Sequence, residues 1–342
     1  MIDALAYLNS APQNRPVATI RQELGDFQVN EIPLITPSGS GEHLWMEIFK
    51  SNLNTQDLAV HLARALDIPV KNVSFAGLKD RRAQTTQWFS AWMPSKSDPK
   101  DLRIVDSAKV LQMVRHHKKL KRGKLQGNRF TLLLKNCSGL DDRLQTSLAK
   151  LEHSGVPNYF GEQRFGRGFG NLSRCLRFFS GTYKPRSRHE RGILISSARA
   201  YLFNRYVDHR LSSNIWDVIL DGDVLNLAGS QSVFVADVTD SALKSRYQEG
   251  DIHISGPLYG CGTTLAEGAA QVIEQQVAQM EKAYFVGLDS VKANYTRRAM
   301  RVIPWDVEFS VLDKKTLRLA FSLPAGAYAT AVLREFFDYS VA

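Results

Sequence analysis

The sequence has no apolar run that could cross a membrane. Its 342 residues contain no stretch that approaches the roughly 18 consecutive apolar residues of a membrane-spanning helix. The amino-terminal segment MIDALAYLNSAPQ lacks both the basic start and the sustained apolar core of a secretory signal. The composition, 44% apolar and 23% charged, is ordinary for a folded protein, so the sequence predicts a cytoplasmic protein.

Cysteine is scarce, and the nucleotide-binding motifs are incomplete. Cys137, Cys175 and Cys261 stand alone, which argues against a disulfide framework or a zinc site and predicts three packing residues. In the glycine-rich segment GEQRFGRGFG, a G-x-G-x-x-G motif would need glycine where Asn171 stands, and no Walker lysine follows. The sequence therefore predicts neither a metal nor a cofactor.

Acidic residues are absent from three segments that are rich in basic ones, in a chain of net charge +10. Residues 107–140 carry nine positive charges, at Lys109, Arg115, Lys118, Lys119, Lys121, Arg122, Lys124, Arg129 and Lys135. Residues 163–189 carry seven more, at Arg164, Arg167, Arg174, Arg177, Lys184, Arg186 and Arg188. The third and shortest segment holds Lys292, Arg297, Arg298 and Arg301.

Such basic segments without interleaved carboxylates favour a polyanionic partner, nucleic acid above all. An anionic membrane surface is the alternative, but no segment combines this charge with a long amphipathic apolar face. We expect Lys118, Lys119, Lys121 and Arg122 to contact RNA phosphates.

The periodicity of apolar residues predicts an α+β protein. Strands are expected at 43–49, 128–135 and 232–238, and a hairpin at 307–312 and 316–321 closed by 313–315. Helices are expected at 54–68 with Asn54 as N-cap, from the capping box Ser138–Asp141 to about Gly155, at 196–211, from the capping box Thr264–Glu267 onward, and at 328–339. A change of texture after Gly155 predicts one domain made of 1–154 and 304–342, interrupted by an inserted domain at 155–303.

The segment FAGLKDRRAQTTQWFS, residues 75–90, is the strongest local signal of chemistry. Val73, Phe75 and Leu78 predict a short buried strand, which would place Asp80 at the strand's end where a carboxylate can meet a substrate. Lys79, Arg81 and Arg82 would favour the ionised carboxylate and attract phosphate. The alternative is that Asp80 is a turn former or the N-cap of a following helix.

Several blocks resemble the TruD family of tRNA pseudouridine synthases. The signature G-x-K-D-x-x-A-x-T-x-Q is met by Gly77, Lys79, Asp80, Ala83, Thr85 and Gln87, and N-Y-F-G-x-Q-R-F-G by residues 158–166. G-N-x-F is met at 127–130, D-F-x-V-x-E at 26–31, and P-A-G-x-[aromatic]-A-T at 324–330, with Tyr328 where the family often has Phe. The helix SSARAYLFN at 196–204 also matches, although its apolar spacing is typical of a core.

The resemblance implies a pseudouridine-synthase catalytic domain with a mixed, largely antiparallel sheet, an inserted α/β TRUD domain, and a monomer without cofactor. Asp80 would be the nucleophile or base, and the substrate uridine 13 in the D arm of tRNA. Phe27, Phe130 and Tyr328 would stack on the flipped base, Asn128 would orient it, and Lys79, Tyr159 and Arg164 would contact the substrate. In its own right, the aromatic and basic loop at 159–165 suits stacking and phosphate contact, or is ordinary aromatic packing.

Two functions of other classes compete with this hypothesis. One is a non-catalytic protein that binds or chaperones structured RNA, and the other is a different base-flipping enzyme such as a glycosylase. The sequence leaves open whether Asp80 attacks C1′, attacks C6, or removes a ribose proton to give a glycal.

Overall fold

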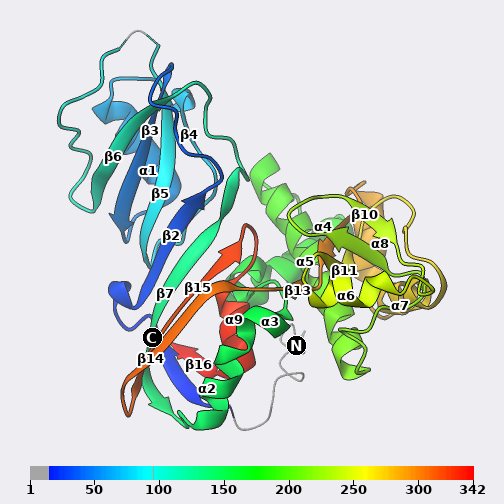
Figure 1. Cartoon of the computed structure of the whole chain (residues 1–342). Coiled ribbons are helices and arrows are strands. Elements are labelled where there is room, and N and C mark those ends of the chain that lie inside the picture. Colours follow the sequence, from blue (N-terminus) through cyan, green and yellow to red (C-terminus); the bar gives the residue numbers. More distant parts are fainter. Residues whose placement is uncertain (1–14, 95) are drawn as a thin grey trace. The chain divides into compact units, whose positions relative to one another are not determined.

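The computed structural model describes residues 15–94 and 96–342, which divide into two compact units (Figure 1). The first unit contains residues 15–152, 304–326 and 337–342, and the second contains 153–303 and 327–336. Helices and strands occur in both, which confirms the α+β class. The domain division into 1–154, 155–303 and 304–342 stays a prediction, and the compact units differ from it chiefly because 327–336 packs with the second unit.

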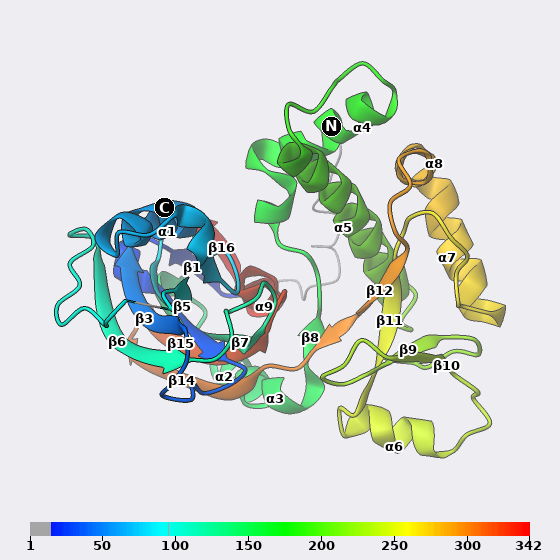
Figure 2. The same cartoon turned by 90° about the horizontal axis from the view of Figure 1, so that it is seen from above.

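A mixed, mostly antiparallel sheet organises the first unit (Figure 2). Its main path runs in the order β14 (Trp305–Asp313), β15 (Thr316–Pro324), β7 (Leu125–Ser138), β2 (Phe27–Pro33), β5 (Gln84–Trp92), β3 (His43–Ser51) and β6 (Ala108–His116). Off this path, β4 (Val73–Phe75) pairs with β5, and β1 (Val17–Ile20) pairs with β7 and with β16 (Asp338–Val341). The β2–β5 and β1–β16 pairs are parallel.

Helix α1 (Thr55–Ala65) packs against this sheet. Its buried residues, among them Leu58 and Leu62, recur at helical spacing and join a core with Leu44 and Ile48 of β3. Asn54 is the N-cap residue as predicted, but its amide donates to Asp57 Oδ2 at 3.0 Å and makes no capping bond to the helix backbone. The helix ends at Ala65, three residues earlier than predicted.

Two predicted capping boxes are wrong, because each helix begins after a later residue than predicted. Ser138 is the last residue of β7, and helix α2 (Asp142–Ala149) begins after Asp141, whose carboxylate accepts from the Leu144 amide at 2.9 Å. A short α3 (Leu151–Ser154) follows, and the next residue is Gly155, whose φ of +63° suits the glycine predicted to end the helix there. Helix α7 (Gly268–Met280) begins after Glu267, while the Thr264 hydroxyl donates to Glu274 instead.

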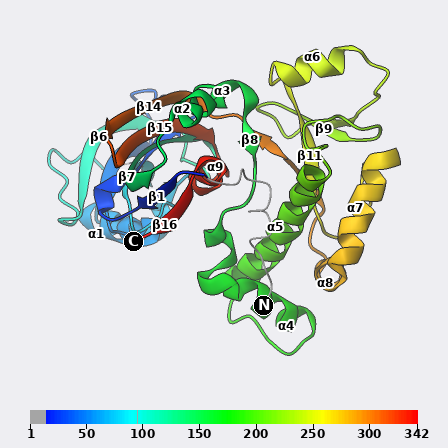
Figure 3. The same cartoon turned by 90° about the horizontal axis from the view of Figure 1, so that it is seen from below.

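The second unit surrounds the long helix α5 (Arg188–Ser212), which contains the predicted helix 196–211 (Figure 3). Around it lie α4 (Gly170–Phe179), α7, α8 (Lys282–Ser290) and a four-stranded sheet in the order β10 (Val233–Val235), β9 (Val224–Leu227), β11 (Ile252–Leu258) and β12 (Thr296–Ala299). The predicted strand 232–238 is therefore only the three residues of β10. The unit also contains α6 (Ala242–Gln248), α9 (Ala329–Phe336), and the pair β8 (Val156–Pro157) and β13 (Arg301–Val302).

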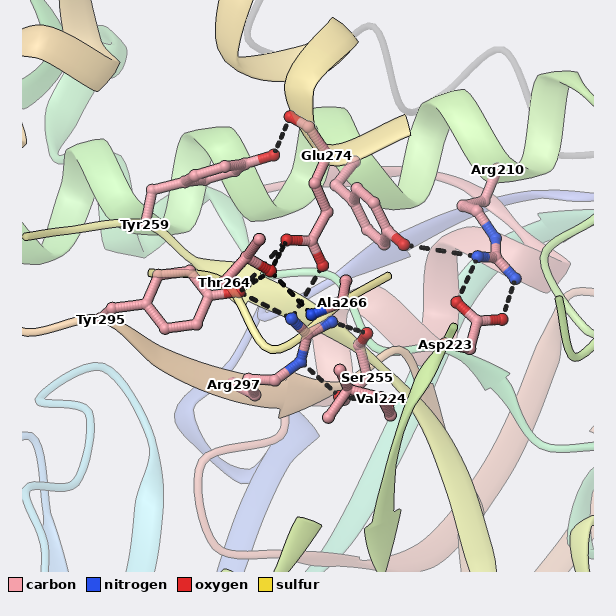
Figure 4. A network of polar contacts seen from close by, with 11 residues as sticks. Arg210, Asp223, Val224, Ser255, Tyr259, Thr264, Ala266, Glu274, Tyr295 and Arg297 are labelled. Atoms are coloured by element: carbon pink, nitrogen blue, oxygen red, sulfur yellow. Dashed lines mark hydrogen bonds and ion pairs between the residues drawn. The ribbon is translucent and has the colours of Figure 1, made fainter. Parts of the chain in front are cut away.

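Buried ion pairs lie inside the second unit (Figure 4). Arg297 of β12 contacts Glu274 of α7 at 2.7 Å, and both side chains are under 5% exposed. Arg210 of α5 contacts Asp223 at 2.9 Å with both side chains fully buried. Because each charge has a partner and further hydrogen bonds, these pairs can lie in the core.

The carboxyl-terminal strands confirm one prediction and correct another. Lys314 and Lys315 join β14 to β15, as the predicted hairpin requires, and the Asp313 carboxylate accepts from the Lys315 amide at 2.7 Å. Helix α9 ends at Phe336, whereas the sequence predicts a helix to Tyr339. The last residues instead form β16, whose main chain pairs in parallel with β1.

Candidate active site

Asp80 lies in the loop between β4 and β5, which we call the Asp80 loop (residues 76–83). Its side chain is 44% exposed. The next element is strand β5, so the alternative in which Asp80 caps a following helix is wrong. The predicted strand is also shorter than expected, because β4 ends at Phe75 and Leu78 is 56% exposed.

Arg21 is the basic partner of Asp80. Its Nη2 lies 2.6 Å from Asp80 Oδ2, and its guanidinium group stands 4.0 Å from the centroid of the Phe27 ring. The effect of Lys79, Arg81 and Arg82 on the ionisation of Asp80 stays a prediction, whereas the ion pair of Asp80 within the described residues is with Arg21. Arg21 thus joins the carboxylate to one of the aromatic residues of the predicted pocket.

Lys79 points to a second acidic residue. Its ammonium group lies 3.0 Å from Glu31 Oε2, with both side chains at most 6% exposed, and it also donates to the amide oxygen of Asn128. Glu31 on β2 and Asn128 on β7 face each other in the sheet register. Three residues from separate predicted motifs therefore meet here, and Lys79 ties the Asp80 loop to the sheet.

The predicted aromatic residues of the first unit form a packed row. The ring centroids of Phe27 and Phe130 lie 6.2 Å apart in an edge-to-face arrangement, and those of Phe130 and Phe321 lie 5.8 Å apart. Phe27 is 3% exposed and Phe130 is 8% exposed. Asp80 is thus connected to Phe27 and Phe130 through Arg21, and Lys79 separately contacts Asn128.

Buried polar side chains hold the Asp80 loop from beneath. The hydroxyl of Thr55 accepts from the Lys79 amide at 3.0 Å and donates to Gln87, whose own amide donates to the Gly77 carbonyl at 3.2 Å. Lys50 donates to the Asp80 carbonyl at 3.1 Å. Gln87 belongs to the sequence motif, whereas no pattern marked Thr55, Lys50 or Arg21, since their partners lie far along the chain.

The basic run 118–122 connects β6 to β7 next to this loop. Lys118, Lys119 and Lys121 are exposed, and the Arg122 guanidinium stands 4.4 Å from the centroid of the Phe75 ring. The Gly123 amide donates to the Ala76 carbonyl at 2.8 Å, which links the run to the start of the Asp80 loop. The positive charge expected at the RNA surface therefore lies in the same unit as Asp80.

The remaining predicted site residues belong to the second unit. Arg164 donates from Nε to the Tyr328 hydroxyl at 2.9 Å, which gives this phenol the polar partner that it needs. The Tyr328 ring packs edge-on against Phe160 at 5.9 Å. Tyr159 is 1% exposed within the hydrophobic core of this unit, and the contact of its ring with substrate stays a prediction.

The described residues contain no group of three or more side chains suited to hold a metal ion. None of their helices is long and apolar enough to span a membrane. Of the three cysteines, Cys137 and Cys175 are buried as expected, and burial raises the pKa of the Cys175 thiol to about 12. Cys261 is exposed, so its prediction as a packing residue is wrong.

Comparison with known proteins gives one consistent result. The family model described as tRNA pseudouridine synthase D (TruD) matches residues 4–171 and 186–336. The chain is 40% identical over 335 residues to tRNA pseudouridine synthase D of Hydrogenovibrio crunogenus, covering 97% of this chain and 96% of that protein. It is 42% identical over 336 residues to the protein of the same name from Nitrosococcus oceani, covering 97% and 93%.

Among solved structures, the putative tRNA pseudouridine synthase D (TruD) from Methanosarcina mazei has the same fold. The TM-score is 0.71 at 24% identity, and the match covers 96% of this chain and 95% of that one.

Proposed function

The chain belongs to the tRNA pseudouridine synthase D family, and we propose that it isomerises uridine to pseudouridine at position 13 in the D arm of tRNA. The observation that carries the proposal is the placement of Asp80. Its carboxylate is accessible, and its loop is anchored on both sides by buried side chains. The ion pair with Arg21 uses Oδ2, which within the described residues leaves Oδ1 for the reaction.

The reaction breaks the bond from N1 to C1′, turns the uracil, and joins C5 to C1′. The hydrogen on C5 is lost and N1 gains a proton, so atoms balance without redox chemistry. Asp80 would initiate it by attack on C1′, by attack on C6, or by removal of a ribose proton to give a glycal. A preorganised carboxylate serves each of the three routes, because it meets the target nucleotide without rearrangement of the loop.

A uridine within a stacked helix must leave the stack before Asp80 can reach it, at a cost of a few kcal/mol. Contacts of the flipped base with Phe27 and Phe130 and with the Asn128 amide would offset this cost in the first unit. Tyr328 and Arg164 would contact RNA from the second unit, and the basic run 118–122 would bind phosphates. The monomeric state and the cytoplasmic location stay predictions.

Position 13 is tested by mapping pseudouridine in unmodified tRNA transcripts that carry U13 or C13. After incubation with the protein, carbodiimide treatment and primer extension should give a stop attributable to position 13 in the U13 transcript only. A stop at another position would contradict the proposed target but support pseudouridine formation. Tight binding without modification in any transcript would instead favour the non-catalytic protein that binds or chaperones structured RNA.

A further inference from the structure

Lys50, next to the last residue of β3, is a lysine in the core of the first unit. Its side chain is 0% exposed. Within residues 15–94 and 96–342, its ammonium group forms no ion pair with a carboxylate side chain, and its hydrogen bonds go to main-chain carbonyls. A buried charge of this kind is unfavourable for folding, which points to a role other than stability.

The two carbonyls show what Lys50 holds. Its Nζ donates to Leu53 at 2.7 Å, in the turn that precedes α1, and to Asp80 at 3.1 Å. Thr55 and Gln87 bind the main chain at Lys79 and Gly77, so they fix the loop before the reactive residue. The bond from Lys50 fixes Asp80 itself.

We propose that Lys50 is a positioning residue for the reaction: its ammonium group holds the main chain of Asp80 so that the carboxylate faces the substrate. This inference rests on the proposed function. The positive charge lies beneath the loop and opposes the displacement of Asp80, as Arg21 does from the side-chain end.

The charge of Lys50 depends on pH near neutrality. Burial lowers its pKa to about 8, an effect opposed by the carboxylate of Asp80 and aided by the ammonium group of Lys79. Its register partners, Thr85 on β5 and Ala108 on β6, carry no titratable group. As the pH rises through about 8, Lys50 loses its charge, its bond to the Asp80 carbonyl weakens, and the rate falls.

The test is the single-turnover rate of pseudouridine formation in a U13 transcript between about pH 6.5 and 9.5, for wild type, Lys50→Met and Lys71→Met. Lys71 is exposed in the turn before β4 and serves as the matched control. Wild type and Lys71→Met should lose rate above about pH 8. Lys50→Met should be about tenfold to a hundredfold slower at pH 7 and lack this decline.

Two further readouts separate positioning from a merely structural role. The affinity of Lys50→Met for the transcript should stay within about twofold of wild type, because the basic surface is intact. Its thermal midpoint should not fall, since removal of a buried charge offsets the two carbonyls left without a donor. The proposal would be contradicted if Lys50→Met lost both rate and thermal stability and its rate still declined above pH 8.

A wild-type rate that is constant from about pH 7 to 9.5 would also contradict it, whatever the variants do. If Lys50→Met fails to fold, Lys50→Arg is measured in its place. Its permanent charge should move the loss of rate at high pH beyond the measured range. A loss of rate that still begins near pH 8 in Lys50→Arg would contradict the role of Lys50. Wild type that forms no pseudouridine at any pH would contradict the proposed function, and this inference with it.

Discussion

Arg21 reaches Asp80 from an unusual backbone conformation. It directly follows β1 and has a φ of +61°, in the left-handed region that non-glycine residues seldom occupy. From there its guanidinium group contacts both the Asp80 carboxylate and the Phe27 ring. Such conformations persist where the surroundings over-determine them, which is frequent at functional sites.

Removal of the Arg21 charge should slow the reaction. We expect Arg21→Met to lower kcat by about tenfold to a hundredfold, since Asp80 loses the charge-assisted bond that orients it. Arg21→Lys should retain more activity. Arg103→Met is the control, because the Arg103–Asp101 ion pair is exposed and remote in sequence from every motif. The rate is measured with tRNA in excess, and a kcat unchanged in Arg21→Met would contradict this role.

At the residue scale, the sequence indicated the candidate nucleophile Asp80 more clearly than the residues that hold it. Asp80 stands in a dense motif, and Lys79, Glu31 and Asn128 each belong to a recognisable block. Arg21 and Lys50 belong to none, because their function comes from partners 59 and 30 positions away that only the fold brings together.

The basic run 118–122 acts as one element, held to the fold by its backbone. Trp45 donates to the Lys118 carbonyl at 2.8 Å, and the Leu120 amide donates to Ser90 at 2.9 Å. Leu120 is buried, whereas its charged neighbours are exposed. The run therefore presents a fixed set of positive charges beside the Asp80 loop.

A variant in which Lys118, Lys119, Lys121 and Arg122 are all replaced by glutamine should bind tRNA more weakly, and its binding should depend less on salt. The slope of log K against log[salt] is negative, and its magnitude should decrease by up to about 3, because up to four phosphate contacts no longer release counterions. The exposed residues Lys71, Lys100, Lys244 and Lys282 provide a control set of equal charge. The slope is measured by titration between about 50 and 200 mM salt, and an unchanged slope would mean that the run does not belong to the interface.

The buried pair Arg297–Glu274 links β12 to α7 in the second unit (Figure 4). Glu274→Leu should lower the free energy of unfolding by about 3–5 kcal/mol, since it leaves a buried guanidinium without its counter-ion. The double variant Glu274→Leu/Arg297→Met should recover much of this loss. Asp251→Asn is the control, because its ion pair with Arg246 is more exposed. It should change the free energy of unfolding, measured by denaturant titration, by less than about 1 kcal/mol.

Elements with local signals were predicted well. The β14–β15 hairpin follows from two alternating runs around a short polar turn, and α1 from its apolar spacing. The predicted starts of α2 and α7 are too early, because the Asp141 carboxylate caps α2 in place of Ser138, and the Thr264 hydroxyl donates to Glu274 while α7 begins only after Glu267. Strand β16 had no local signal, since its partner β1 lies 321 residues away in the Val17–Asp338 pair.

At the scale of the whole molecule, the chain leaves and re-enters each unit. The sequence indicated the change of texture near Gly155, and the structure divides the chain between 152 and 153. The assignment of 327–336 to the second unit could not be read from the sequence, because α9 has an ordinary amphipathic pattern that fits either partner.

His253 should make the whole protein sensitive to acid. Burial lowers its pKa to about 4, with Arg301 adding to the effect and Asp251 opposing it. Because the unfolded chain binds this proton near pH 6.5, stability present above pH 6.5 is lost as the pH falls toward 4. In denaturant titrations, His253→Leu should lose less stability than wild type across this window, and equal losses would contradict the role of His253.

The central claim is that Asp80 performs the isomerisation, and release of the C5 hydrogen tests it most directly. Wild type and Asp80→Asn are incubated with a U13 transcript tritiated at C5 of uridine, and binding of both to the transcript is measured in parallel. Wild type should release tritium into water, while Asp80→Asn releases none and binds with equal affinity. Release by Asp80→Asn at the wild-type rate would contradict the account.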